Sequence, residues 1–311
     1  MAWTKLTNAS GGAPNLNSVN GSLCLVLDWA LVTLGWAIEF TDGANSRVYR
    51  AATGNRHRLW VRHDSAISGL ASRATVRGAE SATSATAVTN PFPTVAQTGD
   101  TLSIWKCGQA STPATNVPYV IYGSGTFFIL FSRLSATGAW RMNFFGDVPG
   151  EYATAYDTVV RVDNLTTDSI TGGNAIGQSA ISQNSKDFWA RGIDLATLSV
   201  YGGMQITANA LVASGRSISF PVMRGGYQNR IVREKIALCD IGSASTTIGV
   251  LAISKRAWLP NLWAPCHSAV GGVVDQDTFT DSVYSATAIF RVFDGGAWTY
   301  IVEETDTWSM P

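Results

Sequence analysis

The acidic segment GDVPGEYATAYD holds three carboxylates that could do chemistry: Asp147, Glu151 and Asp157. A glycosidase needs two carboxyl groups about 5–9.5 Å apart in a cleft. Carboxylate pairs at such separations occur by chance in any β protein, so the segment alone does not indicate hydrolysis. We therefore expect these residues to be structural and the chain to be no enzyme, with no catalytic residues.

Two of the three histidines could be metal ligands. His57 and His63 flank a predicted strand and lie six positions apart, which places them on the same face. Arg56, Arg58 and Arg62 stand beside them and would repel a cation. We interpret this segment as a solvated strand.

Two further segments contain part of a metal-binding pattern but lack some of the residues that it requires. Cys266 and His267 are adjacent but lack further ligands at the spacing that zinc requires. DQDTFTD (residues 275–281) resembles the start of a calcium loop, but Phe279 and Thr280 stand where an EF-hand has Asp or Asn and then Gly. We expect neither a metal nor another cofactor.

The most apolar run, residues 22–40, decides the class of protein. It is slightly short for a membrane span and includes Asp28 and Glu39, so we do not expect it to cross a membrane. The polar residues before it do not resemble a signal peptide. Apolar residues at helical spacing predict a helix that Ser22 or Asn20 caps at its start and that ends at Gly35. That stripe consists of Leu23, Val26, Leu27, Ala30, Leu31 and Leu34.

Three apolar residues of this helix fall outside the stripe: Leu25, Trp29 and Val32. The helix is therefore expected to be covered on more than one side, by the core or by another subunit. After it, residues 36–40 alternate as a strand does, and Asp42-Gly43 is a hairpin signal.

Short apolar or alternating runs between Gly and Pro turns follow along the chain. They predict a mostly β fold, with antiparallel sandwich or barrel-like regions and one short N-terminal helix. The expected strands are 58–62, 71–77, 102–105, 119–122, 126–131, 140–145, 158–162, 195–201, 217–223, 231–238, 248–253, 286–293 and 298–303.

The same pass divides the chain into four parts. Residues 1–20 are expected to be an extended arm, whose Trp3 and Leu6 dock on a neighbouring chain or along the protein's own sheet. Residues 21–163 and 188–311 form two β-rich domains. Residues 164–187, rich in Gly, Ser, Asn and Thr, form a linker or long loop.

Composition favours association with other proteins. Charged residues make up 14% of the chain, against about 25% in typical domains. With 11 tryptophans, this indicates a surface buried against copies of the chain; a monomer with Ser, Thr and Asn on its surface is the alternative. The zero net charge gives no general attraction to nucleic acid, and we expect neither nucleic-acid binding nor membrane insertion. The four scattered cysteines are expected to be reduced and mostly buried.

The charges themselves are unevenly placed. Residues 47–77 contain seven arginines and one acid, and residues 275–306 contain seven acids and one base. The two blocks are either solvated faces or the two sides of a head-to-tail contact between identical subunits. In the second case the contact joins Arg56, Arg58 and Arg62 to Asp275, Asp277 and Asp281.

The segment LPNLWAPCH (residues 259–267) is expected to be a loop or a sheet edge, because Pro260 and Pro265 cannot donate ladder hydrogen bonds. It nevertheless carries Trp263 among other apolar residues. Trp263 either folds back over its own sheet or anchors a contact with a neighbour.

Several short phrases, in order along the chain, resemble a family of virion structural proteins of tailed double-stranded-DNA bacteriophages. They are NASGGAP (8–14), NPFPT (90–94), FFGD (144–147), LPNLWAPCH (259–267), DTF (277–279) and EETDTWS (303–309). The resemblance implies assembly with copies of the chain and with other virion proteins, in particles made in a bacterial cytoplasm. It offers no catalytic motif.

We expect a location in the tail or baseplate, with a capsid decoration or neck protein as the alternative. From another class, a carbohydrate-binding or sugar-cleaving receptor module is the competing interpretation, because the tryptophans could stack on sugars.

Overall fold

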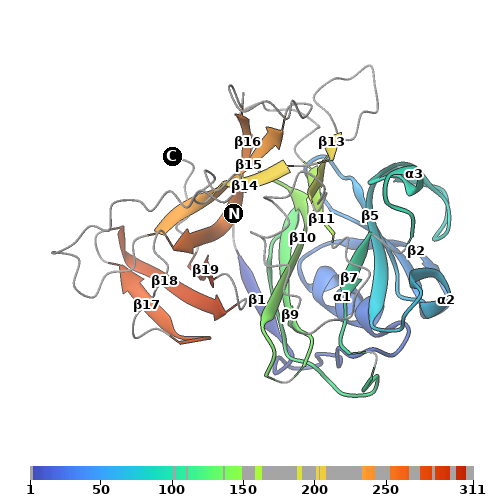
Figure 1. The fold of residues 1–311 in the computed structure, drawn as a ribbon, viewed down its shortest axis with the longest axis horizontal. Coiled ribbons are helices and arrows are strands. Elements are labelled where there is room, and N and C mark those ends of the chain that lie inside the picture. Colours follow the sequence, from blue (N-terminus) through green and yellow to red (C-terminus); the bar gives the residue numbers. More distant parts are fainter. Residues whose placement is uncertain are drawn as a thin grey trace.

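The computed structural model describes residues 3–100, 103–109, 111–135, 137–148, 158–162, 188–190, 201–202, 204–207, 233–241, 253–265, 274–281, 284–294 and 299–305. Within these residues the strands form three antiparallel sheets (Figure 1). The expected mostly β fold with an N-terminal helix is confirmed.

A seven-stranded central sheet has the order β1-β8-β9-β10-β11-β12-β13. Its members are β1 (Thr4–Thr7), β8 (Tyr119–Gly123), β9 (Phe127–Arg133), β10 (Trp140–Asp147), β11 (Thr158–Arg161), β12 (Phe188–Ala190) and β13 (Tyr201–Gly202). The helix-side sheet has the order β2-β3-β4-β5-β6, and β7 also pairs with β5. Its members are β2 (Ala37–Asp42), β3 (Ser46–Arg50), β4 (Arg58–Arg62), β5 (Arg73–Ala82), β6 (Val88–Phe92) and β7 (Ile104–Lys106).

The C-terminal sheet has the order β14-β15-β16-β19-β18-β17. Its members are β14 (Met204–Thr207), β15 (Arg233–Ile241), β16 (Ile253–Pro265), β17 (Thr278–Asp281), β18 (Ser285–Asp294) and β19 (Thr299–Glu303). The helices are α1 (Ser22–Thr33) and two single turns, α2 (Ser65–Ser68) and α3 (Val95–Thr98).

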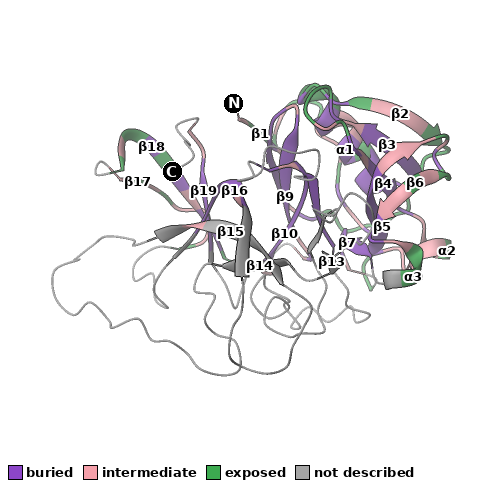
Figure 2. Ribbon diagram, turned by 90° about the horizontal axis from the view of Figure 1, so that it is seen from above, coloured by how far each residue is buried: buried purple, intermediate pink, exposed green. Residues whose placement is uncertain are grey.

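Strands β8, β9 and β10 of the central sheet are buried on both faces, and Figure 2 shows β9 and β10 as almost wholly buried. Side chains alternate across a strand, so Ile121 and Phe128 join the core shared with α1 and the helix-side sheet. Tyr122 and Phe131 point the other way, into a core shared with the C-terminal sheet. Because both faces are covered, the hairpin β8–β9 is a nearly continuous apolar run.

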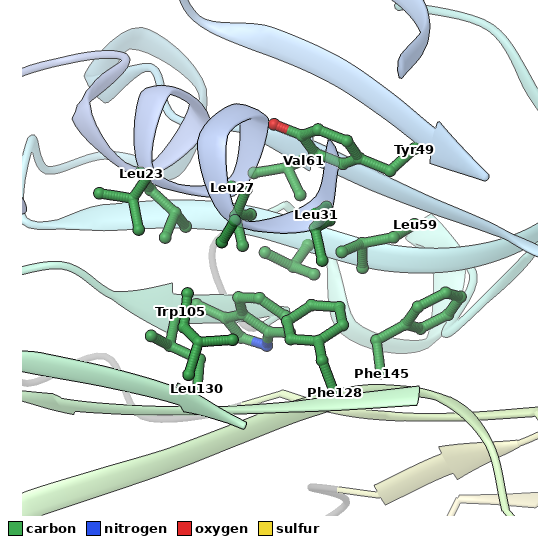
Figure 3. Packing of buried hydrophobic residues seen from close by; sticks show 14 of the residues in the cluster. Leu23, Leu27, Leu31, Tyr49, Leu59, Val61, Trp105, Phe128, Leu130 and Phe145 are labelled. Atoms are coloured by element: carbon green, nitrogen blue, oxygen red, sulfur yellow. The ribbon is translucent and has the colours of Figure 1, made fainter. Parts of the chain in front are cut away.

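Helix α1 closes the core between the central and helix-side sheets. Figure 3 shows Leu23, Leu27 and Leu31 packed among side chains of both sheets, including Leu59 and Phe128. All six residues of the predicted stripe are buried.

The predicted N-terminal caps of α1 were wrong. Gly21 is the N-cap, in the left-handed region at φ 85°, and its side chain offers no acceptor. A Cβ at Gly21 would lie 2.8 Å from the Ala44 carbonyl oxygen, so glycine is required by both conformation and contact. At the other end Gly35 has a φ of 87°, and the Trp36 amide donates to the Leu31 carbonyl, as expected of a glycine-terminated helix.

The expectation of a loop or edge at residues 259–267 was also wrong for the part that the structure describes. Strand β16 is an interior strand, paired with β15 on one side and β19 on the other. Pro260 is tolerated because the pairing skips: Lys235 faces Trp263 while Ala237 faces Trp258, which leaves the intervening residues in a bulge. Asn261 in that bulge has a φ of 55°.

The two expected β-rich domains have a sheet and a hydrophobic core in common. Strands β12 and β13, which follow the predicted linker in sequence, extend the central sheet. Leu259 and Phe293 pack into the same core as Ile129 and Phe144. Residues 164–187 themselves lie outside the described residues.

Candidate functional site

Asp147 is held in a polar cluster that joins two sheets. Its Oδ2 accepts the Asn55 amide at 2.7 Å, and its Oδ1 accepts the Thr158 hydroxyl at 2.5 Å. Since that hydroxyl proton is given to Asp147, His57 Nδ1 must donate to Thr158 Oγ1 over their 2.7 Å separation. A Cβ at Gly54 would lie 2.1 Å from Asp147 Oδ2, so the loop approaches as closely as only glycine allows.

This arrangement does not fit nucleophilic catalysis. In a hydrolytic triad the histidine accepts the hydroxyl proton and the carboxylate orients the histidine. Here the carboxylate contacts Thr158 directly, and both carboxylate oxygens of Asp147 are engaged. Asp147 thus connects the central and helix-side sheets through these hydrogen bonds. Glu151 and Asp157 lie outside the described residues.

The expected solvated strand around the two histidines was wrong. His57 is 8% exposed and His63 is fully buried, and strand β4 between them is buried at its centre. His63 Nδ1 accepts the Leu23 amide at 3.1 Å and therefore carries no proton, so Nε2 donates to the Ala71 carbonyl at 2.9 Å. Burial lowers the pKa of His63, which keeps the imidazole neutral. His63 supplies the capping acceptor that Gly21 cannot.

The N-terminal arm takes the second of its two expected positions, along its own sheet. Strand β1 pairs with β8, and Leu6 is buried in the core that contains α1. Trp3 packs against the opposite core, with its ring centroid 6.2 Å from that of Phe127.

Trp263 is likewise covered by its own chain. It is 6% exposed and makes edge contacts with Tyr284 and Phe290, with ring centroids 5.2 Å and 6.1 Å away. Lys235 Nζ lies 5.4 Å from the centre of its ring. Of the two interpretations, the structure supports the side chain that folds back over its own sheet.

The basic block is largely neutralised within the chain. Arg58, expected at a subunit contact, instead makes two hydrogen bonds to Glu39. Arg56 is exposed, and Arg62 lines a pocket. The ion pairs of the block include Arg47 with Asp28 (3.0 Å), Arg50 with Glu39 (3.5 Å), Arg58 with Glu39 (2.8 Å) and Arg77 with Asp100 (2.7 Å).

The acidic cluster has internal partners as well. Asp275 pairs with Arg133 and accepts hydrogen bonds from Trp140 Nε1 at 3.0 Å and from the Asp294 amide at 2.9 Å. Asp277 accepts the Val274 amide at 2.9 Å, and Asp281 accepts the Tyr284 amide at 3.4 Å. A contact between this cluster and the arginines of a neighbouring subunit stays a prediction, and Arg56 and Arg62 are its remaining basic members.

One exposed apolar surface of the described residues was not among the predicted site residues. Leu25 is 51% exposed and Val32 is 53% exposed on the outer side of α1, and Trp29 between them is partly buried. These three residues stand at i, i+4 and i+7, directly opposite the buried stripe. We call them the outer face of α1. Their position outside the stripe was the available sequence signal.

No group of three or more His, Cys, Asp and Glu side chains in the described part of the chain is placed to hold a metal ion. Cys266 and His267 lie outside the described residues. Cys24 and Cys107 are buried thiols, and burial raises the pKa of Cys24 to about 12. Among the described helices, none has the length and apolarity needed to cross a membrane.

Beside Arg62, a pocket of about 270 Å³ opens between the β2–β3 turn and α2.

Comparison with models of protein families gives no match, and comparison with curated proteins gives no similar sequence.

Proposed function

We propose that this chain is a non-enzymatic virion structural protein of a tailed bacteriophage, which assembles with copies of itself and with neighbouring virion proteins. The short phrases that resemble that family and the low content of charged residues support this assignment. A tail or baseplate position is our first choice, and capsid decoration or the neck is the alternative.

The outer face of α1 is the observation that carries the assembly proposal. A helix that is apolar on all sides is normally covered on all sides. In the single chain, Leu23 and Leu27 are buried while Leu25 and Val32 are about half exposed on the opposite side. Isolated exposed apolar residues are ordinary, but an aligned set on one helix is typical of a contact surface.

The charge around the outer face agrees with a protein partner. Asp28, on the flank of α1, is paired with Arg47 at 3.0 Å and accepts the Tyr49 hydroxyl at 2.9 Å. The acid next to this apolar surface is therefore already neutralised, and burying the helix against another subunit leaves no unpaired carboxylate there.

Quantitative mass spectrometry of purified phage particles tests the assignment. We expect the chain in a fixed multiple of copies per particle, and its absence from infectious particles would overturn the proposal. Replacing Leu25 and Val32 by Ser should lower incorporation strongly. Val95→Ser is the matched control, because Val95 is also 53% exposed but lies on α3.

A further inference from the structure

A polar pocket lies where strand β4 ends, on the face of the helix-side sheet that points away from the α1 core. Val61 points into that core, so its neighbour Arg62 points to the other face, as Trp60 does. Arg62, Asp42 and Asp64 line the pocket.

Arg62 differs from the paired arginines around it. Its guanidinium carbon lies 5.3 Å from the centre of the Trp60 ring, yet its Nε is buried with no hydrogen-bond acceptor among the described residues. Asp42 and Asp64 line the same pocket without forming an ion pair with it. This nitrogen is closed to solvent, so a ligand oxygen in the pocket would accept from the terminal N–H groups of the Arg62 guanidinium instead.

The walls of the pocket are held in place before any ligand arrives. The Ala85 carbonyl accepts hydrogen bonds from Trp60 Nε1 and Ser46 Oγ, both at 2.8 Å, and this fixes the loop that carries Thr86. Asp64 is oriented by the Ala66 amide, 2.9 Å from its Oδ1. A preorganised site loses less entropy on binding.

The charges decide the chemistry of the ligand. An anion would face the carboxylates of Asp42 and Asp64, and a cation would face Arg62. Hydroxyl groups both accept and donate, so a neutral polyol can accept from Arg62 and donate to the two carboxylates. Ile67 adds an apolar wall for the C–H face of a ring.

We infer that this pocket binds one residue of a neutral sugar. Its volume of about 270 Å³ falls just below the range of roughly 300–1,000 Å³ for drug-sized ligands, which suits a single ring. This activity is separate from assembly through α1, since the pocket and the outer face of α1 share no residue.

Saturation-transfer NMR on the full chain tests the inference. The probes are the methyl glycosides of glucose, galactose, mannose, rhamnose and N-acetylglucosamine, with glucuronate and glucosamine as charged comparators. We expect transfer to at least one neutral glycoside. Arg62→Gln should weaken it about tenfold or more, the loss expected for a hydrogen bond to a charged group.

Arg56→Gln is the control, since Arg56 is exposed in the preceding loop and does not line the pocket. Asp42→Asn, at the exposed end of strand β2, is a second pocket variant for use if Arg62→Gln does not fold. Transfer to none of the neutral probes, transfer to glucuronate or glucosamine alone, or unchanged transfer in the pocket variants would each overturn the inference. Particle incorporation is measured separately with Asp42→Asn, which lies outside both proposed subunit contacts, and should be normal.

Discussion

Lys5 and Glu304, 299 positions apart in the sequence, form an ion pair with 2.6 Å between Nζ and Oε1. The same carboxylate accepts the Tyr122 hydroxyl and Arg291 Nε, each at 2.6 Å. One side chain therefore joins the N-terminal strand, the central sheet and the C-terminal sheet. The arm is part of the fold and cannot be regarded as a loose tail.

Glu304→Gln should lower the free energy of unfolding by about 1–3 kcal/mol at neutral pH, because it removes a charged acceptor from three donors. Burial raises the pKa of Glu304, but hydrogen bonds from Arg291, Lys5 and Tyr122 outweigh this and hold the pKa at about 2. The folded pKa is depressed, so this stabilisation is present above about pH 4.5 and is lost as the pH falls towards 2. Urea unfolding at several pH values measures it, and an equal acid sensitivity in Glu304→Gln would contradict it.

Acid should also weaken the start of α1 through His63. Burial lowers its folded pKa below 6.5, so the stabilisation is complete above pH 6.5 and declines as the pH falls through the lowered value. Protonating Nδ1 would set a second donor against the Leu23 amide at the positive end of the helix. His63→Ala should cost about 0.5–2 kcal/mol at neutral pH, as for a lost cap. Its unfolding free energy should change less between pH 7 and 5 than that of the unaltered chain; the same slope in both would refute this role.

Alanine substitutions at Gly43 and Gly54 allow the cost of backbone strain to be measured apart from the cost of a steric clash. Gly43 and Gly54 both have positive φ, 56° and 74°, but only at Gly54 would a Cβ strike another group, the Asp147 carboxylate. Gly43→Ala should cost about 1–2 kcal/mol, the penalty for a left-handed alanine. Gly54→Ala should cost clearly more, because it also breaks the connection between the two sheets. Equal losses in chemical unfolding would show that Asp147 moves away at little cost.

Trp263→Ala should destabilise the chain by about 3–5 kcal/mol, as expected for a large buried aromatic residue. Its ring contacts are all to the same chain, so association of the folded fraction should be unchanged. Thermal unfolding and sedimentation of one sample measure both quantities. Lost association with an unchanged melting temperature would restore Trp263 as an anchor for a neighbour.

Local patterns predicted much of this fold. The apolar stripe predicted α1 and its buried side, and Gly35 marked its end, because these signals depend on residues within a few positions. Strand β4 matched its expected bounds. The expected strands 119–122 and 126–131 correspond to β8 and β9, which pair with each other as a hairpin.

The failures came from contacts distant in sequence. The cap of α1 is His63, 40 positions away, so a search for local caps could not find it. Pro260 indicated an edge, but a bulge places it in an interior strand. Arg58 was expected at a subunit contact, but its acceptor Glu39 lies 19 positions away in the sequence, on strand β2 of the same sheet.

Sedimentation velocity over a range of concentrations tests the central claim, that the outer face of α1 is an assembly surface. The unaltered chain and Val95→Ser should both associate as concentration rises. A chain with Leu25→Ser and Val32→Ser should stay monomeric, with an unchanged melting temperature because both side chains are about half exposed. If the unaltered chain is monomeric throughout, or the double variant associates equally well, the claim is contradicted.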